Sequence, residues 1–167
     1  MLFRSCIIFV ERKRWAEDLY RLLRLHRPRV ALMHGDLPQP MRNRIMAGFR
    51  SGKIVFLVAT DVVGRGIDVK NISHIINYDM PEDPENYVHR IGRTGRIGAD
   101  GVAVAFVTPE QGRQLTQVEA YINKQIEEIR LEGFEAYATR TRQPEESKPK
   151  STTPVFGRRT KRYSKRP

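Results

Sequence analysis

Apolar residues along this chain follow two different spacings. Five short stretches are interpreted as strands, residues 5–10, 29–33, 53–59, 73–78 and 101–107, and the first of them is a continuous run rich in β-branched residues. Such runs are typical of strands that are covered on both faces, because a strand with one solvent face alternates apolar and polar residues. We therefore expect a sheet of buried strands.

Between the first three strands, apolar residues recur every three or four positions, which is the spacing of one helical face. One helix is predicted over residues 12–25 and another over residues 39–52, where Gly52 is a natural stop. The apolar face of the first helix is expected to contain Trp15, Leu19, Leu22 and Leu23. The apolar face of the second is expected to contain Met41, Ile45 and Phe49.

Two further helices are marked by the residues at their starts. Asp83 as an N-cap and Pro84 at the first helical position predict a helix that begins at residue 84. Thr108 and Gln111 form a T-x-x-Q capping box ahead of the next helix. The apolar residues expected to stack along that helix are Leu115, Val118 and Ile122.

Strands that alternate with helices predict an α/β fold, a parallel β-sheet with helices on both faces. Residues 126–136 are expected to add a half-exposed strand. Ligands of such sheets bind outside the carboxyl ends of the strands. Three polar, glycine-bearing stretches, residues 34–42, 60–69 and 79–96, each directly follow a strand. We expect these stretches to converge on one edge of the sheet and to form a site there.

Composition limits the class of protein. The 167 residues suffice for one domain with a full core, 40% of them are apolar, and no apolar run is long enough to span a bilayer. Residues 1–10 are interpreted as a buried strand rather than a signal peptide. Cys6 is the only cysteine, so a reducing compartment, the cytoplasm, is expected. The four histidines have no spacing suited to a metal site.

The net charge of +11 is concentrated at the end of the chain. Residues 140–167 hold ten basic and two acidic residues, a balance of +8, whereas residues 1–139 hold 20 basic and 17 acidic residues, a balance of +3. We predict a folded domain over residues 1–139 and a disordered basic tail over residues 140–167, because the tail has too few large apolar residues to offset its ordering entropy. The tail is interpreted as an arm that binds a polyanion, with a solubilising appendage as the alternative.

The stretch after the third strand carries groups suited to a nucleotide or a phosphate. Gly64 and Gly66 flank Arg65 and allow close approach of the backbone to a ligand. Thr60 can offer a hydroxyl and an amide to a phosphate, and Asp68 can accept a hydrogen bond from a ribose hydroxyl. The alternative is a plain tight turn in which Arg65 pairs with Asp61.

The stretch HRIGRTGR, residues 89–96, contains Arg90, Arg93 and Arg96, with no acidic residue nearer in sequence than Glu85 or Asp100. These arginines are predicted to lack partners within the chain, and Arg90 and Arg93, three apart, to share one helix face. Guanidinium groups match phosphate oxygens in a bidentate manner. The alternative is that the cations only complement a helix dipole.

Four stretches together resemble a known family. CIIFV, HGDLPQPMR, VATDVVGRGIDV and YVHRIGRTGR, in this order and spacing, are similar to the second RecA-like domain of a DEAD-box RNA helicase. The resemblance covers about residues 5 to 125, and the extension and basic tail that follow resemble those of bacterial members. One departure is Gly64, where the family often has alanine; glycine there can loosen the turn.

The resemblance implies a role for each matching residue. Arg93 and Arg96 would be the arginine fingers on the γ-phosphate of ATP bound with Mg²⁺, and Phe9 would lie behind them. Asp68 would contact the ribose. Coupling to the other domain would involve Arg65, His89 and Arg90. The RNA phosphates would be held by Gln39, Arg42, Thr60 and the backbone near Gly35.

The sequence contains neither a G-x-x-x-x-G-K-[ST] phosphate loop nor a D-E-A-D stretch. The resemblance therefore implies the C-terminal half of an ATP-dependent RNA helicase, which would not hydrolyse ATP alone and whose partner is the N-terminal RecA-like domain of the same protein. The expected RNA binding is independent of base sequence. Two alternatives remain: a superfamily-two DNA helicase domain, and an RNA-binding or assembly module without a catalytic role.

Overall fold

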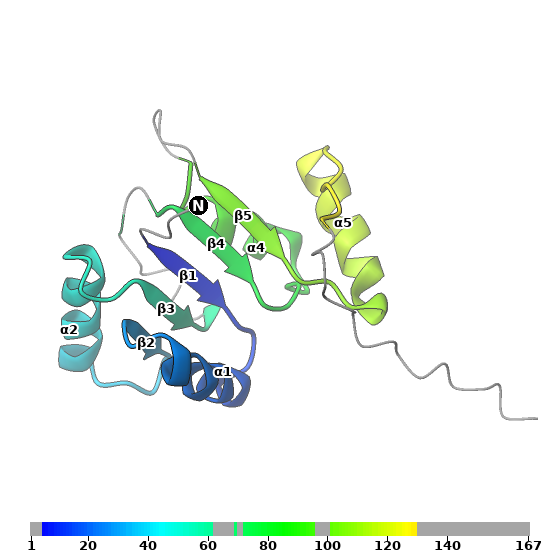
Figure 1. Cartoon of the computed structure of the whole chain (residues 1–167). Helices are drawn as coiled ribbons and strands as arrows, with labels where there is room; N and C mark the ends of the chain where they lie inside the picture. Colours follow the sequence, from blue (N-terminus) through cyan, green and yellow to red (C-terminus); the bar gives the residue numbers. More distant parts are fainter. Residues whose placement is uncertain (1–4, 62–68, 70–71, 96–100, 130–167) are drawn as a thin grey trace, which may run out of the picture. The chain divides into compact units, whose positions relative to one another are not determined.

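The computed structural model describes residues 5–61, 69, 72–95 and 101–129. They form a five-stranded parallel sheet in the order β2-β3-β1-β4-β5 (Figure 1). The strands are β1 Cys6–Phe9, β2 Val30–Met33, β3 Phe56–Ala59, β4 His74–Asn77 and β5 Val102–Ala105. Each strand predicted from the five apolar runs is confirmed, although each observed strand is shorter than its run.

Helices cover both faces of the sheet, as predicted. They are α1 Lys13–His26, α2 Gln39–Arg50, α4 Pro84–Ile91 and α5 Gly112–Ile122, the last preceded by the short helix η1 Pro109–Gln111. No helix within the described ranges is both long and apolar enough to cross a membrane. The sheet and these helices belong to a compact unit, Met1–Glu127, and Glu128–Pro167 forms a second unit.

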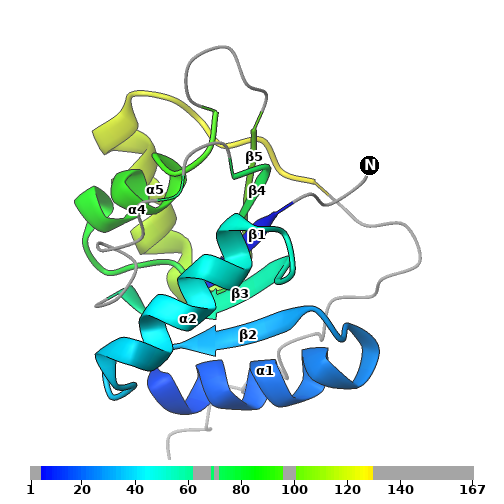
Figure 2. The same cartoon turned by 90° about the vertical axis from the view of Figure 1, so that its left-hand side faces the viewer.

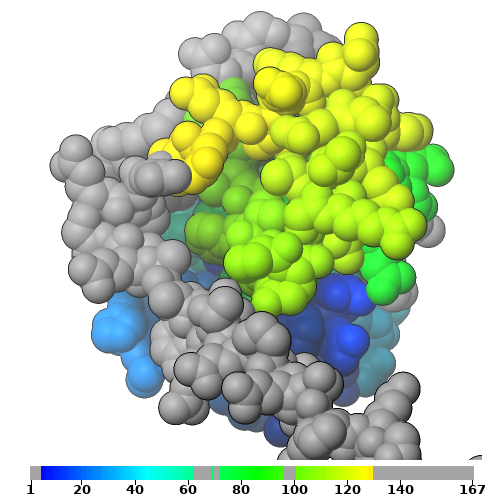
Figure 3. All heavy atoms as spheres, turned by 90° about the vertical axis from the view of Figure 1, so that its right-hand side faces the viewer, coloured from blue at the N-terminus to red at the C-terminus, as the bar shows by residue number. Residues whose placement is uncertain are grey.

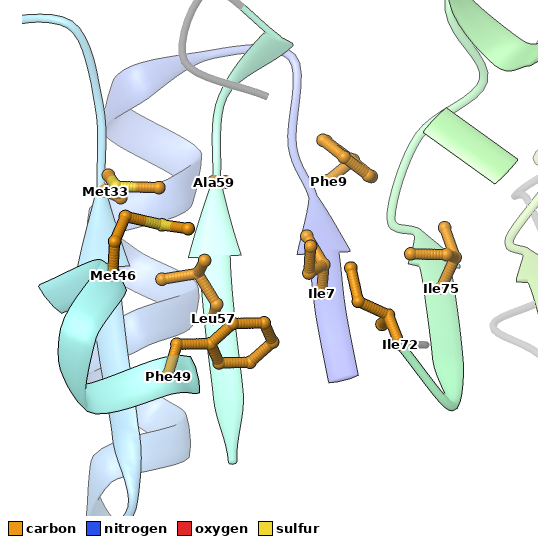
Figure 4. Packing of buried hydrophobic residues seen from close by; sticks show 9 residues of the cluster. All are labelled: Ile7, Phe9, Met33, Met46, Phe49, Leu57, Ala59, Ile72 and Ile75. Atoms are coloured by element: carbon orange, nitrogen blue, oxygen red, sulfur yellow. The ribbon is translucent and has the colours of Figure 1, made fainter. Parts of the chain in front are cut away.

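Alternate residues of the strands face opposite helices. On one face, Met46 and Phe49 of α2 pack on a cluster that includes Ile7 and Leu57, and Figure 4 shows these side chains lying side by side. On the other face, Ala16 of α1 packs on a cluster that contains Cys6, Ile8, Val30 and Val58. The continuous apolar runs in the sequence are explained by this double coverage.

The two start signals are confirmed. The Asp83 carboxylate accepts a hydrogen bond from the backbone N–H of Glu85 at 2.9 Å and caps α4. Thr108 and Gln111 form both halves of the capping box at η1. Val118 of α5, buried, packs with Met80 and Tyr87, and the predicted neighbours Leu115 and Ile122 pack on the same cluster. Figure 3, which views the molecule from the right-hand side of Figure 1, shows the yellow-green residues of α5 facing the viewer.

Two helical faces differ from the prediction. Trp15 and Leu22 are exposed, because the side of α1 that faces the sheet is formed by Ala16, Leu19 and Leu23. On α2, Met41 is exposed and Met46 is buried in its place. In both helices the spacing of apolar residues allows more than one face, and contact with the sheet selects among them.

The predicted last strand is not found in its described part, residues 126–129. The remainder of that segment, residues 130–136, lies outside the described residues. The same holds for the predicted domain boundary at residue 139 and for the basic tail, residues 140–167, both of which stay predictions.

The buried thiol of Cys6 makes the stability of the fold sensitive to alkaline pH. Burial raises the pKa of Cys6 to about 12, against about 8.5 for an unfolded chain. Between these values the unfolded chain loses a proton that the folded chain keeps, so raising the pH favours unfolding. Relative to Cys6→Ala, the wild-type free energy of unfolding should fall by roughly 1.4 kcal/mol per pH unit above about pH 8.5.

Urea unfolding of both chains from pH 7 to pH 10 measures this difference. Cys6→Ala is the internal control, because all other titrating groups are shared. A difference between the two chains that stays constant over this range would contradict the prediction.

Candidate functional site

The loops that follow β2 and β3 meet at the carboxyl edge of the sheet. The backbone N–H of Thr60, just after β3, donates to the carbonyl oxygen of Met33, the last residue of β2, at 3.3 Å. The stretch after β4 joins them through Arg90 of α4, which reaches Asp61 beside Thr60. The predicted convergence is therefore confirmed for the first stretch, for Thr60 and Asp61 of the second, whose residues 62–68 lie outside the described residues, and for the part of the third that ends at Arg90.

Arg90 is the most highly connected side chain of this edge. It is only 2% exposed, and its Nε and Nη2 donate to the two carboxylate oxygens of Asp61 at 2.7 and 2.6 Å. Its Nη1 donates to Asn77 Oδ1 at 3.2 Å and to the carbonyl oxygen of Asp79 at 2.9 Å. The guanidinium group lies 5.5 Å from the ring centre of Phe9. Arg90 is thus bound within the domain.

The expectation that Arg90 lacks a partner in the chain is wrong. Its partner, Asp61, lies 29 residues earlier in the sequence, so inspection of the neighbouring residues could not find it. Both oxygens of Asp61 accept from Arg90, whereas Arg65, the partner of Asp61 in the alternative of a tight turn, lies outside the described residues.

Asp79 ties this arginine to the end of β1. Its two carboxylate oxygens accept from the backbone N–H of Glu11 at 3.1 and 2.8 Å, and Oδ1 lies 3.6 Å from Nη2 of Arg90. Burial raises the pKa of Asp79, although the Glu11 N–H and Arg90 act in the opposite direction. Sequence reasoning missed both Asn77 and Asp79. The signal was available: a polar side chain at the end of an apolar run has no water to bind once it is buried.

Arg93 does not share a helix face with Arg90. Helix α4 ends at Ile91 with Gly92 as its C-cap, and Arg93 lies in the following turn, where its N–H donates to the carbonyl oxygen of Arg90 at 3.3 Å. The next residue, Thr94, donates from its hydroxyl to the carbonyl oxygen of Ile72. The prediction of one shared face is therefore wrong, because Gly92 ends the helix before Arg93.

The turn that carries Arg93 is attached near the start of β4. Ile72, which binds Thr94, precedes β4, whereas Asp79 follows it. The predicted convergence on one edge is therefore wrong for the end of the third stretch. Gly95 has a φ of +64°, and a Cβ on Gly101 would clash with the Thr94 side chain. A side chain is therefore disfavoured at both glycines, and the turn is held to the residue before β4 by the Thr94–Ile72 contacts.

Three of the residues predicted to bind RNA lie between β2 and the first turn of α2. Gly35 is in an exposed turn, Gln39 is the exposed first residue of α2, and Arg42 is half-buried one turn later. Helix α2 has no side-chain cap at its N-terminus. Thr60 is buried beside β2 through its bond to Met33. The structure thus brings these four predicted residues to one edge.

Three buried nitrogen atoms near this edge have no hydrogen-bond partner within the described ranges: Nε of Arg42, Nδ1 of His34 and Nδ2 of Asn77. Most buried polar groups in proteins are satisfied, so such atoms need an explanation. The Nε–H of an arginine can only donate. What Nε of Arg42 lacks among the described residues is therefore an oxygen acceptor.

Other predicted residues are placed less completely. His89 is half-exposed, with Nε2 at 3.7 Å from the carboxylate of Glu85. Arg65, Asp68 and Arg96 lie outside the described residues, as does Gly64. The roles assigned to them stay predictions. Within the described part of the chain, no group of three or more His, Cys, Asp or Glu side chains could hold a metal ion.

The buried Arg90–Asp61 pair should be important for stability. Removing Arg90 leaves Asp61, which is 29% exposed, and the buried Asp79 without their cation. Arg90→Ala should therefore lower the free energy of unfolding, by at most the roughly 3–5 kcal/mol that breaking a fully buried pair costs, measured by urea denaturation with circular dichroism. Arg44→Ala, on the exposed side of α2, is the matched control and should change it by less than about 0.5 kcal/mol. Similar losses for the two variants would refute this assignment.

Comparison with known proteins identifies relatives of this chain. The family model described as "Helicase conserved C-terminal domain" matches residues 3–98. Eukaryotic initiation factor 4A of Caenorhabditis elegans is 46% identical over 125 residues, which are 75% of this chain and 31% of that protein. The ATP-dependent RNA helicase RhlB of Shewanella frigidimarina is 46% identical over 122 residues, 73% of this chain and 28% of the relative. The chain thus spans about three tenths of the length of these relatives.

The fold also matches solved structures. Dbp5 of S. cerevisiae bound to RNA and ADP BeF3 superposes with a TM-score of 0.69 and 40% sequence identity, over 77% of this chain and 34% of that chain.

Proposed function

Since this chain belongs to the helicase conserved C-terminal domain family, as a RecA-like domain of the DEAD-box type, we propose that it is the C-terminal half of an ATP-dependent RNA helicase. In this proposal it holds RNA phosphates and supplies arginine fingers during ATP-driven unwinding of RNA duplexes. The N-terminal RecA-like domain of the same protein is its partner. We place the protein in the cytoplasm, where the free thiol of Cys6 stays reduced.

The observation that carries the proposal is the unpartnered Nε of Arg42 at the carboxyl edge. Gly35 lies in the loop that leads to α2, and Gln39 is the first residue of α2. Thr60 is bonded to Met33, at the end of β2 just before this loop. The N-terminus of α2 has no side-chain cap, and the positive end of its dipole favours an anion, although the N–H groups of Met41 and Arg42 already donate to the carbonyl oxygen of Pro38. A phosphate of the RNA backbone satisfies these groups without reading a base, which is why we expect no sequence preference.

Arg93 and Arg96 are proposed as the fingers on the γ-phosphate of ATP. The turn of Arg93 is fixed by Gly92 and by the Thr94–Ile72 bond, so its position is set before nucleotide arrives. A planar guanidinium group stabilises charge that develops on the phosphoryl oxygens. Asp68 is proposed to bind the ribose. The N-terminal domain would hold most of the ATP and the Mg²⁺, because this sequence contains no phosphate loop and no D-E-A-D stretch.

Arg90 is proposed to couple the two halves of this site from inside the domain. It binds Asp61, which follows the RNA-binding candidate Thr60, and it lies three residues before Arg93, in the last turn of α4. A shift of Thr60 on RNA binding would therefore be transmitted through a rigid ion pair to the turn of Arg93. Arg65 and His89 are proposed to contact the partner domain. These residues position others and are distinct from the fingers, which would touch the nucleotide.

One relative and one solved structure among those named above favour RNA over DNA as the nucleic acid. One of them is named an ATP-dependent RNA helicase, and the solved structure of Dbp5 contains RNA. A role as an RNA-binding module without catalysis remains the alternative, and the finger variants distinguish it from the helicase.

In the two-domain protein, Arg93→Lys or Arg96→Lys keeps the charge and removes the bidentate fork. Loss of an arginine finger costs roughly 10³–10⁵ in turnover in related phosphoryl-transfer systems. We expect a loss of this size in RNA-stimulated ATP hydrolysis, with ATP binding much less affected, because the interaction forms in the transition state. Arg44→Lys is the control. Near-normal turnover in both finger variants would exclude the assigned role.

Deletion of residues 140–167 should weaken RNA binding and its dependence on salt. The ten basic residues of this tail attract phosphates and release counterions. For single-stranded RNA, the plot of log affinity against log salt should become flatter by about 0.7 for every phosphate that the tail had neutralised. The measurement is a salt titration of the chain and of a chain that ends at Thr139. Equal slopes would show that the tail does not touch RNA.

A further inference from the structure

Helix α1 has a second apolar surface on the side away from the sheet. Trp15, Leu22 and Leu25 are 43%, 62% and 77% exposed, and together we name them the α1 ridge. The sheet-facing side of the same helix is formed by Ala16, Leu19 and Leu23. Figure 2 shows α1 with β2 along one of its sides. The ridge is therefore not needed to attach the helix to the domain.

The spacing of the α1 ridge is that of a helix–helix seam. Its residues are seven and three positions apart, so they lie within one stripe of the helix surface. Ten residues of helix extend over about 15 Å. None of the three residues belongs to the groups proposed to bind RNA or nucleotide. Exposed apolar residues that cluster on one element mark an interaction site more often than scattered ones do.

Positive charge borders the ridge. The guanidinium group of Arg12 lies 4.8 Å from the ring centre of Trp15, and Arg14 and Arg21 are on the flank of the stripe. The acidic residue within the stripe, Asp18, is paired with Arg21 at 3.3 Å. The border is thus basic, and its partner should be acidic.

We propose that the α1 ridge docks an acidic amphipathic helix of another protein. Leucines of that helix would pack between Trp15, Leu22 and Leu25, and its carboxylates would face the border arginines. A two-helix seam with flanking opposite charges is a standard mode of helix recognition. This inference does not rest on the proposed helicase function.

Other occupants fit less well. A second copy of this chain would bring the same basic border against itself, which is repulsive. The tail of this chain, residues 140–167, is also basic, with ten basic residues against two acidic ones. RNA binds exposed aromatic rings by stacking, and Leu22 and Leu25 offer no ring for this.

Trp15 is the only tryptophan of the chain, so its fluorescence reports directly on the ridge. The probe is a 14-residue helical peptide without tryptophan, with leucine at heptad positions a and d and glutamate at e and g. A matched peptide carries lysine in place of glutamate. With the full 167-residue chain, the glutamate peptide should shift the Trp15 emission to shorter wavelength and reduce its quenching by acrylamide. The lysine peptide should do neither.

Variants locate the binding. Leu22→Gln and Leu25→Gln should each lower the affinity for the glutamate peptide by about tenfold, because each removes an apolar side chain that becomes buried in the complex. Tyr121→Gln on α5, where the ring is 58% exposed, is the matched control and should have no effect. All three sites are exposed, so urea unfolding should show that the fold is unchanged.

Several results would overturn the proposal. One is an unchanged Trp15 emission wavelength with millimolar glutamate peptide, and another is an equal change of that wavelength with the lysine peptide. A third is a loss of affinity in Tyr121→Gln as large as that in the leucine variants. A Trp15 shift caused by single-stranded RNA, and lost in Leu22→Gln, would assign the ridge to nucleic acid instead. Dimerisation in analytical ultracentrifugation that Leu25→Gln abolishes would assign it to a second copy.

Discussion

The ion pair between Arg90 and Asp61 is the interaction on which the carboxyl edge of the sheet depends. The pair joins α4 to Asp61, which lies just beyond β3. Nη1 of Arg90 also donates to Asn77, the last residue of β4, and to the carbonyl oxygen of Asp79, two residues later. Asp79 extends the network to Glu11 after β1. Taking such charges out of water is costly, and a buried pair adds little net stability over apolar packing. Its contribution here is therefore to geometry, because a bidentate pair fixes both distance and orientation.

This geometry is compatible with the two kinds of phosphate contact that we propose for the domain. The loop after β2, the start of α2 and Thr60 lie at one edge, and the turn of Arg93 is attached near the beginning of β4. Arg90 spans the interval between them. A loosely packed helix would leave these groups free to shift independently. With a rigid pair at its centre, the proposed RNA contacts and the proposed finger are held in a fixed relation.

Helix α1 shows that one amphipathic pattern can contain two surfaces. Leu19 and Leu23 stabilise the domain, whereas Leu22 and Leu25 contribute nothing to the core clusters that the structure describes. Exposed leucines persist at a cost in solubility unless something covers them. The ridge and the phosphate contacts use different residues, so docking at α1 and binding at the carboxyl edge are separable in experiments.

The sequence by itself determined the features that depend on neighbouring residues. The five strands follow from short, mostly apolar stretches, and the starts of α4 and η1 follow from Asp83 and the Thr108–Gln111 box, because these bonds form within four residues. The quoted motifs also sufficed for the family. Only the tertiary structure decided which face of α1 and of α2 is buried and that Arg90 binds Asp61. It also decided that the turn of Arg93 lies near the start of β4 rather than at the carboxyl edge of the sheet. Each of these depends on residues brought together from distant parts of the chain, and periodicity carries no information about which distant partner a side chain will meet.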